Sequence, residues 1–262
     1  MPQKTTSPAV IGEYLSFNHC ERYFKHRANG IEETKNHNKS EFAEAFNPLG
    51  ILLSKTGEDF EQEIYENVKR GVDEVIDLNT GDDSVDADHS RLIDLIGEIQ
   101  DRPKSDRPTP IYQPTVEGEI QDWKIGGHAD FVFLWPLQGD KAELRVVDAK
   151  SASEQKSYHQ VQAAIYVSLI KDVVEASAQI NAEQITFSGG IISRSSDYTP
   201  PKRSNVPSFD YRPRLNDVSR LLEGDGEIDR VNSQPLSEAQ HQLDGKCSGC
   251  AYNERCSAKC VD

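Results

Sequence analysis

Asp130 and the tripeptide Asp148-Ala149-Lys150 are the residues of this 262-residue chain whose types and spacing could do chemistry. In an extended strand, residues i and i+2 point to the same face, so Asp148 and Lys150 are expected on one face. Two carboxylates supply the hard oxygen ligands that Mg²⁺ or Mn²⁺ prefers, and a lysine places a cation near an attacking water. These groups are suited to metal-dependent hydrolysis of a phosphodiester.

The segment Glu41–Val75 is predicted to be helical. Its apolar residues recur at helical spacing but are interrupted near Pro48 and Gly57, which predicts two helices or one broken helix. Glu58 and Glu61 lie on this segment.

A second helix is predicted over Ser157–Val174, directly after the Asp148-Ala149-Lys150 strand. Gln162 and Tyr166 stand at i and i+4 on it, which places them on one face. Both side chains are therefore expected to face the same neighbour.

The remaining helices, strands and loops are predicted from the spacing of apolar residues and from turn-forming residues. Pro8–Phe24 is predicted to be a short helix or turn, and Arg91–Ile99 and Leu215–Leu222 to be helices. Short β-rich runs separated by Gly, Asp or Pro predict three successive antiparallel strands and a later fourth strand: 115–121, 128–135, 144–149 and 184–193. Polar or Pro-rich stretches predict loops, the last of them mobile: 30–40, 79–89, 103–114 and 194–212.

Taken in order, these motifs resemble the PD-(D/E)XK nuclease superfamily in its RecB-like branch. Gly127-His128-Ala129-Asp130 is similar to the first acidic motif, Asp148-Ala149-Lys150 to the second, and Gln162-Ala163-Ala164-Ile165-Tyr166 to the Gln-x-x-x-Tyr motif. The resemblance implies that Asp130 and Asp148 bind the metal and that Lys150 positions or activates water. It also implies that Gln162 and Tyr166 hold the DNA backbone and the site.

The resemblance extends upstream to Gly57-Glu58-Asp59-Phe60-Glu61, which is similar to a helix motif that often adds one more metal ligand. That ligand is usually a histidine in this branch, and here Glu61 or Glu58 would take its role. His128 is expected to share a face with Asp130 and to lie beside the metal. The implied catalytic set is Asp130, Asp148, Lys150 and Glu61.

The cysteines form a second candidate site. Five cysteines is an odd number, and Cys20 stands far from the other four, which does not suit a disulfide framework. Metal binding in a reducing cytoplasm fits better. Cys247, Cys250 and Cys256 are close enough in sequence to wrap a metal, and both zinc and iron-sulfur are chemically allowed. A zinc site that uses Cys260 as its fourth ligand is the alternative.

One cysteine before the predicted core and three after it resembles the iron-sulfur RecB-like nucleases, including the CRISPR-associated exonucleases and the AddB-type helicase-nuclease subunits. The resemblance implies a structural [4Fe-4S] cluster held by Cys20, Cys247, Cys250 and Cys256. The CRISPR-associated branch is the most similar, although stand-alone repair and viral relatives share these motifs.

The charge balance, with 44 acidic and 29 basic residues and a net charge of −15, argues by itself against binding to a phosphate backbone. A nuclease needs only a local basic groove, however, and an acidic surface is typical of proteins that work in concentrated salt, which suggests a halophilic source. No stretch has the apolar length of a secretion signal or a membrane helix. A soluble, cytoplasmic protein is therefore expected.

These observations predict an α/β fold with a restriction-endonuclease-like core. Its central sheet is expected to be mixed, mostly antiparallel and flanked by helices, with a cysteine-bearing helical cap made from both termini. The expected divisions are an N-terminal part of the cap (1–40), the nuclease core (41–230) and a C-terminal cysteine cap (231–262).

The predicted function is that of a Mg²⁺- or Mn²⁺-dependent DNA exonuclease acting on single-stranded ends. Its expected context is CRISPR adaptation or DNA repair, with CRISPR integration or repair proteins as partners. Two alternatives stay open at this point: a metal-stabilised DNA-binding or scaffolding protein whose nuclease core has decayed, and a zinc-bound regulatory protein.

Overall fold

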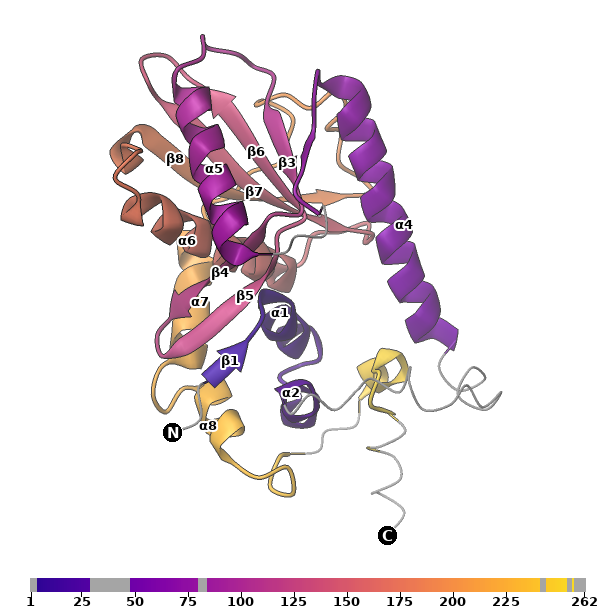
Figure 1. The fold of residues 1–262 in the computed structure, drawn as a ribbon. Helices are drawn as coiled ribbons and strands as arrows, with labels where there is room; N and C mark the ends of the chain where they lie inside the picture. The colour runs from indigo at the N-terminus through magenta and orange to yellow at the C-terminus, as the bar shows by residue number, and fades with distance from the viewer. Residues whose placement is uncertain (1–3, 29–47, 80–83, 241–243, 254–255, 257–262) are drawn as a thin grey trace.

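The computed structural model describes residues 4–28, 48–79, 84–240, 244–253 and 256, which form two β-sheets surrounded by helices (Figure 1). The expected loop at 30–40, the start of the helix expected from Glu41, and Cys260 lie outside the described residues. No helix within the described ranges combines the length and apolar character needed to cross a bilayer.

The larger sheet has the strand order β2-β3-β6-β7-β8. The bounds of its strands are β2 Ile76–Asp77, β3 Thr109–Tyr112, β6 Phe131–Pro136, β7 Ala142–Lys150 and β8 Ile185–Ser193. The pairs β3-β6 and β6-β7 are antiparallel, whereas β2-β3 and β7-β8 are parallel. The prediction of a mixed sheet in an α/β fold is confirmed, and antiparallel pairs are half of this sheet rather than most of it.

The smaller sheet has the order β1-β5-β4, with β1 at Lys4–Thr6, β4 at Thr115–Ile120 and β5 at Trp123–His128. The prediction of three successive antiparallel strands over 115–149 is wrong, because β4 pairs with β5 here and β6 pairs with β7 in the larger sheet. The predicted strand 128–135 is two strands. His128 ends β5, and the chain leaves the small sheet before β6 begins at Phe131.

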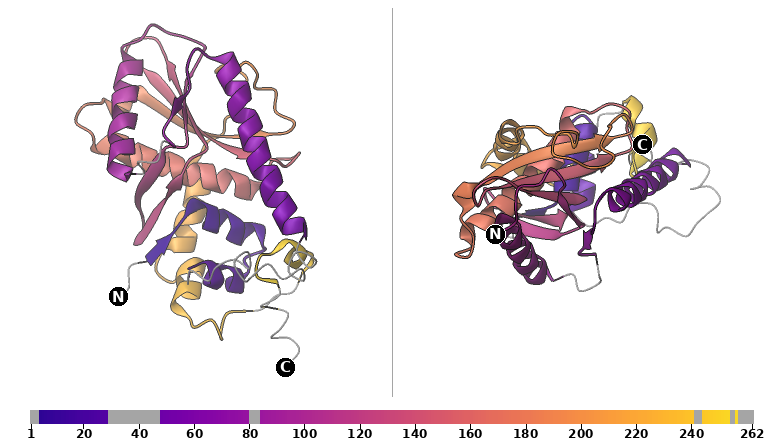
Figure 2. Two further views of the ribbon diagram at one scale, coloured as in Figure 1. Left: turned by 45° about the vertical axis from the view of Figure 1, so that its right-hand side comes forward. Right: turned by 90° about the horizontal axis from the view of Figure 1, so that it is seen from above.

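Within the described residues, nine further elements surround the sheets. Their bounds are α1 Pro8–Ser16, α2 Glu21–Ala28, α4 Pro48–Gly71, α5 Val85–Gln100, α6 Ser157–Ala176, α7 Arg212–Leu222, α8 Glu227–Ser233, and the short 3-10 helices η2 Ala182–Gln184 and η3 Gly245–Gly249. Helices α5 and α6 pack on the face of β6 and β7 that carries Val132 and Val146, and α4 packs on the face that carries Phe133 and Val147. The larger sheet is therefore covered on both sides (Figure 2).

Several predicted boundaries move for local reasons. Helix α4 continues through Gly57 without a break, and Pro48 begins it, a position that tolerates the missing N–H of proline. Helix α5 begins inside the expected polar loop, because Ser84 Oγ accepts a hydrogen bond from Ala87 N at 3.1 Å and caps it. Between α1 and α2, Asn18 adopts a positive φ of 54°, which splits the expected single element in two.

Strand β3 lies within the stretch 103–114, which was expected to be a loop because of its prolines. Strand β2 pairs only with Ile111 and Tyr112, so Pro110 has no partner on that side, where proline is tolerated. The stretch 194–211 contains no helix or strand, yet it packs on the sheet. Tyr198 and Val206 are buried against α4 and β7, and Phe209 lies against β8.

The two ends of the described chain also pack on one another (Figure 1). Glu21 of α2 accepts hydrogen bonds from Arg230 and Gln234 at 2.7 Å each and from the backbone of Gln240 at 2.8 Å. Lys246 donates to Asn18 at 2.8 Å. The N-terminal helices and the segment after α7 therefore form one packed unit beneath the sheets.

Candidate active site

Asp130 and Asp148 lie opposite one another at the junction of β6 and β7. The register pairs Phe131 with Val147, so the next pair toward the end of the sheet is Asp130 and Asp148. The backbone N–H of Ala149 donates to Asp130 Oδ2 at 2.7 Å, which fixes that carboxylate beside β7. Asp148 is only 2 % exposed.

Lys150 lies next to Asp148 on the same face of β7, as the alternation of strand residues predicts. Its Nζ donates to Asp148 Oδ1 at 3.0 Å and stands 2.9 Å from Oδ2. Oδ2 is nevertheless buried without a hydrogen bond of acceptable geometry. The Asp148 carboxylate therefore presents both of its oxygen atoms to the ammonium group of Lys150.

The electrostatics of this cluster follow from burial and from mutual repulsion. Burial and the charge of Asp148 raise the pKa of Asp130, and burial likewise raises the pKa of Asp148, while Lys150 opposes both shifts. Burial works against the charge of Lys150, but the charges of Asp148 and Asp130 outweigh it and raise the pKa of Lys150. Lys150 therefore stays protonated, and the two carboxyls lack full compensation for their negative charge.

Glu61 approaches the same cluster from α4. Its Oε1 accepts hydrogen bonds from Tyr112 Oη at 3.0 Å and from Gln113 Nε2 at 2.7 Å. Burial, followed by the charge of Asp130, raises the pKa of Glu61, and Lys150 opposes the shift. Glu61 is therefore within electrostatic range of Asp130 and Lys150.

Tyr112 and Gln113 are site residues that the sequence reasoning missed. Gln113 also donates its backbone N–H to Asp130 O at 3.1 Å, so this residue links the positions of Glu61 and Asp130. It adopts a positive φ of 48°. The sequence of the Pro-rich stretch 103–114 does not predict this turn, because Tyr112 and Gln113 belong to no recognisable motif.

Glu58 and His128 lie apart from this cluster. Glu58 is exposed on α4, one turn before Glu61. His128 is exposed at the end of β5, with its Nδ1 3.3 Å from Thr115 Oγ1. The expectation that His128 shares a strand face with Asp130 is wrong, because the chain changes sheets between the two residues.

Helix α6 brings Tyr166 against the first acidic motif. A Cβ atom added at Gly127 would stand 2.6 Å from Tyr166 Oη, so the phenol lies directly on the backbone there. Burial, then the charges of Asp130 and Asp148, raise the pKa of Tyr166. Gln162, one turn earlier, lies beside Gly12 of α1. Both residues thus face the α1 and β5 side of α6.

Divalent metal is the cofactor that these residues would serve. Within the described ranges, no three His, Cys, Asp or Glu side chains converge into a metal-binding group. Mg²⁺, however, is usually held by one or two carboxylates together with waters and substrate phosphates. Asp130 and Asp148, two carboxylates side by side at the ends of β6 and β7, fit that mode of binding.

The thiols lie together at the packed chain ends. Cys250 is buried in a cluster with Tyr23 and Tyr252, and Cys20 packs against it. Burial, together with the neighbouring thiols Cys20 and Cys256, raises the pKa of Cys250 to about 11. Burial and Cys247 likewise raise the pKa of Cys20. A cluster-bearing cap stays a prediction, because the described cysteines do not form a metal-binding group.

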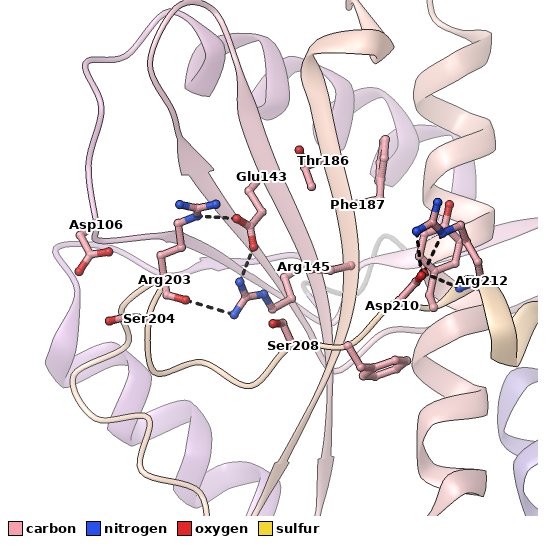
Figure 3. A pocket seen from close by; sticks show the side chains of 13 residues that line it. Asp106, Glu143, Arg145, Thr186, Phe187, Arg203, Ser204, Ser208, Asp210 and Arg212 are labelled. Atoms are coloured by element: carbon pink, nitrogen blue, oxygen red, sulfur yellow. Dashed lines mark hydrogen bonds and ion pairs between the residues drawn. The ribbon is translucent and has the colours of Figure 1, made fainter.

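A separate cavity of about 780 Å³ lies at the opposite end of β7 and β8 (Figure 3). Its wall carries Arg145, which donates to Glu143 and to the backbone oxygen of Val206. Arg203 binds the same glutamate. This network holds the stretch 203–206 against the sheet. Glu143 and Arg145 lie on the face of β7 opposite to Asp148, so the cavity is separate from the candidate active site.

Three comparisons with known proteins bear on this arrangement. A search of curated proteins found no match. One solved structure, described as "Crystal structure of SSO0001", shares 12 % identity with a TM-score of 0.36, covering 99 % of this chain and 89 % of that chain. A family model described as the PD-(D/E)XK nuclease superfamily matches residues 16–257. The chain belongs to the PD-(D/E)XK nuclease superfamily.

Proposed function

We propose that this protein is a Mg²⁺- or Mn²⁺-dependent DNA exonuclease that hydrolyses phosphodiester bonds at single-stranded ends. The observation that carries the proposal is the meeting of Asp130, Asp148 and Lys150 at one end of β6 and β7, with Glu61 in electrostatic range. Membership of the superfamily supports a phosphodiester-hydrolysing nuclease. DNA rather than RNA, and ends rather than internal bonds, come from the resemblance to RecB-like enzymes.

Each residue has a role that its position permits. Asp130 and Asp148 would hold the metal, with Glu61, in electrostatic range, as the further ligand that the resemblance implies. The bound metal would lower the pKa of a water molecule and offset charge at the phosphorus. The ammonium group of Lys150 orients that water beside the carboxylates. Tyr166 supports the backbone of the first acidic motif, and Gln162 on the same face of α6 assists in holding the substrate strand.

A digest of labelled linear and circular single-stranded DNA, with Mg²⁺ or Mn²⁺, tests the proposal. The wild-type protein is expected to shorten linear DNA and spare circles. Asp148→Asn and Lys150→Ala should each lose activity about a hundredfold or more, because they remove a metal ligand and the cation beside the water. Asp94→Asn, at an exposed position on α5, is the matched control and should cleave normally.

The same digest separates the exonuclease from its alternatives. Cleavage of circles would show an endonuclease instead. DNA binding without cleavage, unchanged by Asp148→Asn, would favour a decayed binding or scaffolding protein. The absence of both binding and cleavage would favour a regulatory protein. Assays should span low and molar salt, because the net charge of −15 is consistent with a salt-adapted source.

We further propose a structural [4Fe-4S] cluster on Cys20, Cys247, Cys250 and Cys256. The packing of Cys20 against Cys250 supports ligands from both ends of the chain. Iron, sulfide and zinc analysis of protein purified without oxygen provides the test. Cys20→Ser should abolish iron binding and Cys260→Ser should not, whereas zinc lost through Cys260→Ser but kept in Cys20→Ser would show the alternative zinc site.

The biological setting that we propose is cytoplasmic, in CRISPR adaptation or in DNA repair. Both roles require an enzyme that trims DNA ends, and integration or repair proteins would be its partners. A pull-down with tagged protein, with and without nuclease treatment of the lysate, would show which class of partner binds directly.

A further inference from the structure

Arg194 stands at the end of the sheet that carries the candidate active site. Strand β8 runs parallel to β7 and pairs Ser193 with Lys150, so Arg194 is the first residue beyond that pair. Its backbone N–H donates to Ala152 O at 3.3 Å, and its Nε donates to Ser151 O at 2.9 Å. The guanidinium is therefore anchored to the segment that directly follows Lys150.

The same guanidinium also contacts α4. Its Cζ lies 5.1 Å from the ring centroid of Phe60, the residue before Glu61. Stacking on an aromatic face holds a guanidinium flat and limits its rotation. Arg194 thus bridges the sequence neighbours of Lys150 and Glu61, two groups of the candidate site that come from different elements.

The binding capacity of Arg194 is not used by these contacts. The hydrogen bond of Nε uses one edge of the guanidinium and the Phe60 ring covers one of its faces, while the residue as a whole is exposed. Among the residues that the structure describes, no carboxylate lies within ion-pair distance of Arg194. Most other arginines of the described residues are paired with carboxylates, although Arg22, Arg70 and Arg220 are not. The paired ones are Arg27, Arg91, Arg102, Arg107, Arg145, Arg203, Arg212, Arg214 and Arg230.

We propose that Arg194 binds a backbone phosphate of the substrate strand beside the scissile bond. The inference rests on the proposed function and adds a substrate contact to it. A guanidinium with two free amino groups matches the geometry of a phosphate oxygen pair, and its contact is independent of base sequence. The competing explanation is that Arg194 only clamps α4 to the segment after β7.

Binding of labelled single-stranded DNA across a range of salt concentrations tests the proposal. The parent is Asp148→Asn, so that bound DNA stays intact. Adding Arg194→Gln should weaken binding about tenfold, and it should reduce the slope of log affinity against log salt by about 0.7, the value for one lost phosphate contact on a single strand. Adding Arg194→Lys should restore most of the slope, because the charge is kept.

Arg91→Gln in the same parent is the matched control, since Arg91 is an exposed arginine of α5 that pairs with Glu98. A slope for Arg194→Gln equal to that of Arg91→Gln, with a lowered melting temperature, would overturn the proposal in favour of a clamp. A parent that does not bind DNA, with wild-type protein that does not cleave it, would overturn both the proposed function and this inference. A parent that binds but is insensitive to Arg194→Gln overturns this inference alone.

Discussion

Asp148 and Lys150 each compensate for the burial of the other, and the cluster depends on that balance. An isolated buried carboxylate costs several kcal/mol, and the cost falls when a cation and hydrogen-bond donors surround it. Here one lysine faces Asp148 and Asp130, with Glu61 in range, so negative charge exceeds positive charge. A cluster of this kind gains from a divalent cation, which argues that its composition serves catalysis rather than stability.

Gln113 and Tyr112 position Glu61, and their removal should weaken metal binding. We expect two variants, Gln113→Ala and Tyr112→Phe, each to raise the Mg²⁺ concentration for half-maximal activity about tenfold. Tyr112→Phe removes only a hydroxyl. The rate at saturating Mg²⁺ should change little, because the water and Lys150 are untouched. A titration of activity against Mg²⁺ measures both quantities. An unchanged half-saturation with a reduced maximal rate would contradict a positioning role.

At the scale of elements, α6 packs on β5 closely enough that Gly127 has no room for a side chain. Gly127→Ala should place a methyl group on the Tyr166 hydroxyl and destabilise the protein by about 1–3 kcal/mol. Adding Tyr166→Phe removes that hydroxyl, and the ring carbon behind it would stand at an ordinary 3.6 Å. Urea unfolding of the four proteins in a double-mutant cycle should therefore show recovery in the double variant. Purely additive losses would count against this contact.

The N-terminus of α6 contains a histidine that must stay neutral. Burial, then the charges of Lys150 and Lys156, lower the pKa of His159 to about 4, and its Nδ1 accepts the backbone N–H of Lys156 at 3.3 Å. Since the folded pKa lies below the ordinary value of 6.5, this group contributes stability above pH 6.5 and loses it as the pH falls toward 4.

The free energy of unfolding should therefore fall less between neutral pH and pH 4 in His159→Gln than in the wild type, by about 2 kcal/mol. Melting temperatures measured from neutral to acid pH provide the comparison. Parallel pH profiles for the two proteins would rule out the titration of His159 as a source of acid lability.

The elements that the sequence predicts well are those with a sustained period. Helix α6 and strands β7 and β8 lie where apolar spacing places them, and with them come the positions of Asp148, Lys150 and Tyr166. The change of sheets between His128 and Phe131 is not visible in sequence, because it depends on which strands the two segments pair with: β5 pairs with β4, and β6 pairs with β3 and β7. Gln113 was missed for the same reason, since its role exists only once β3 lies beside β6 and α4.

At the scale of the whole molecule, helix α2 and the segment that follows α7 meet at one buried carboxylate. Glu21 is 5 % exposed and accepts three hydrogen bonds from the segment that follows α7. Burial opposes its ionisation, but the hydrogen bonds from Gln240, Arg230 and Gln234 prevail and lower the pKa of Glu21. This contact closes a loop of most of the chain, and the three hydrogen bonds help to offset the conformational entropy lost in that closure.

Glu21→Gln tests how much this contact stabilises the fold. A folded pKa below the ordinary value of 4.5 means that the stabilisation is full above that pH and is lost as the pH falls through the folded pKa. We expect Glu21→Gln to cost about 2–3 kcal/mol at neutral pH and progressively less in acid, as the wild-type carboxyl becomes protonated. Glu98→Gln, on exposed α5, should cost little at any pH. If the loss of unfolding free energy in Glu21→Gln did not decrease in acid, packing rather than the charge of Glu21 would account for the contact.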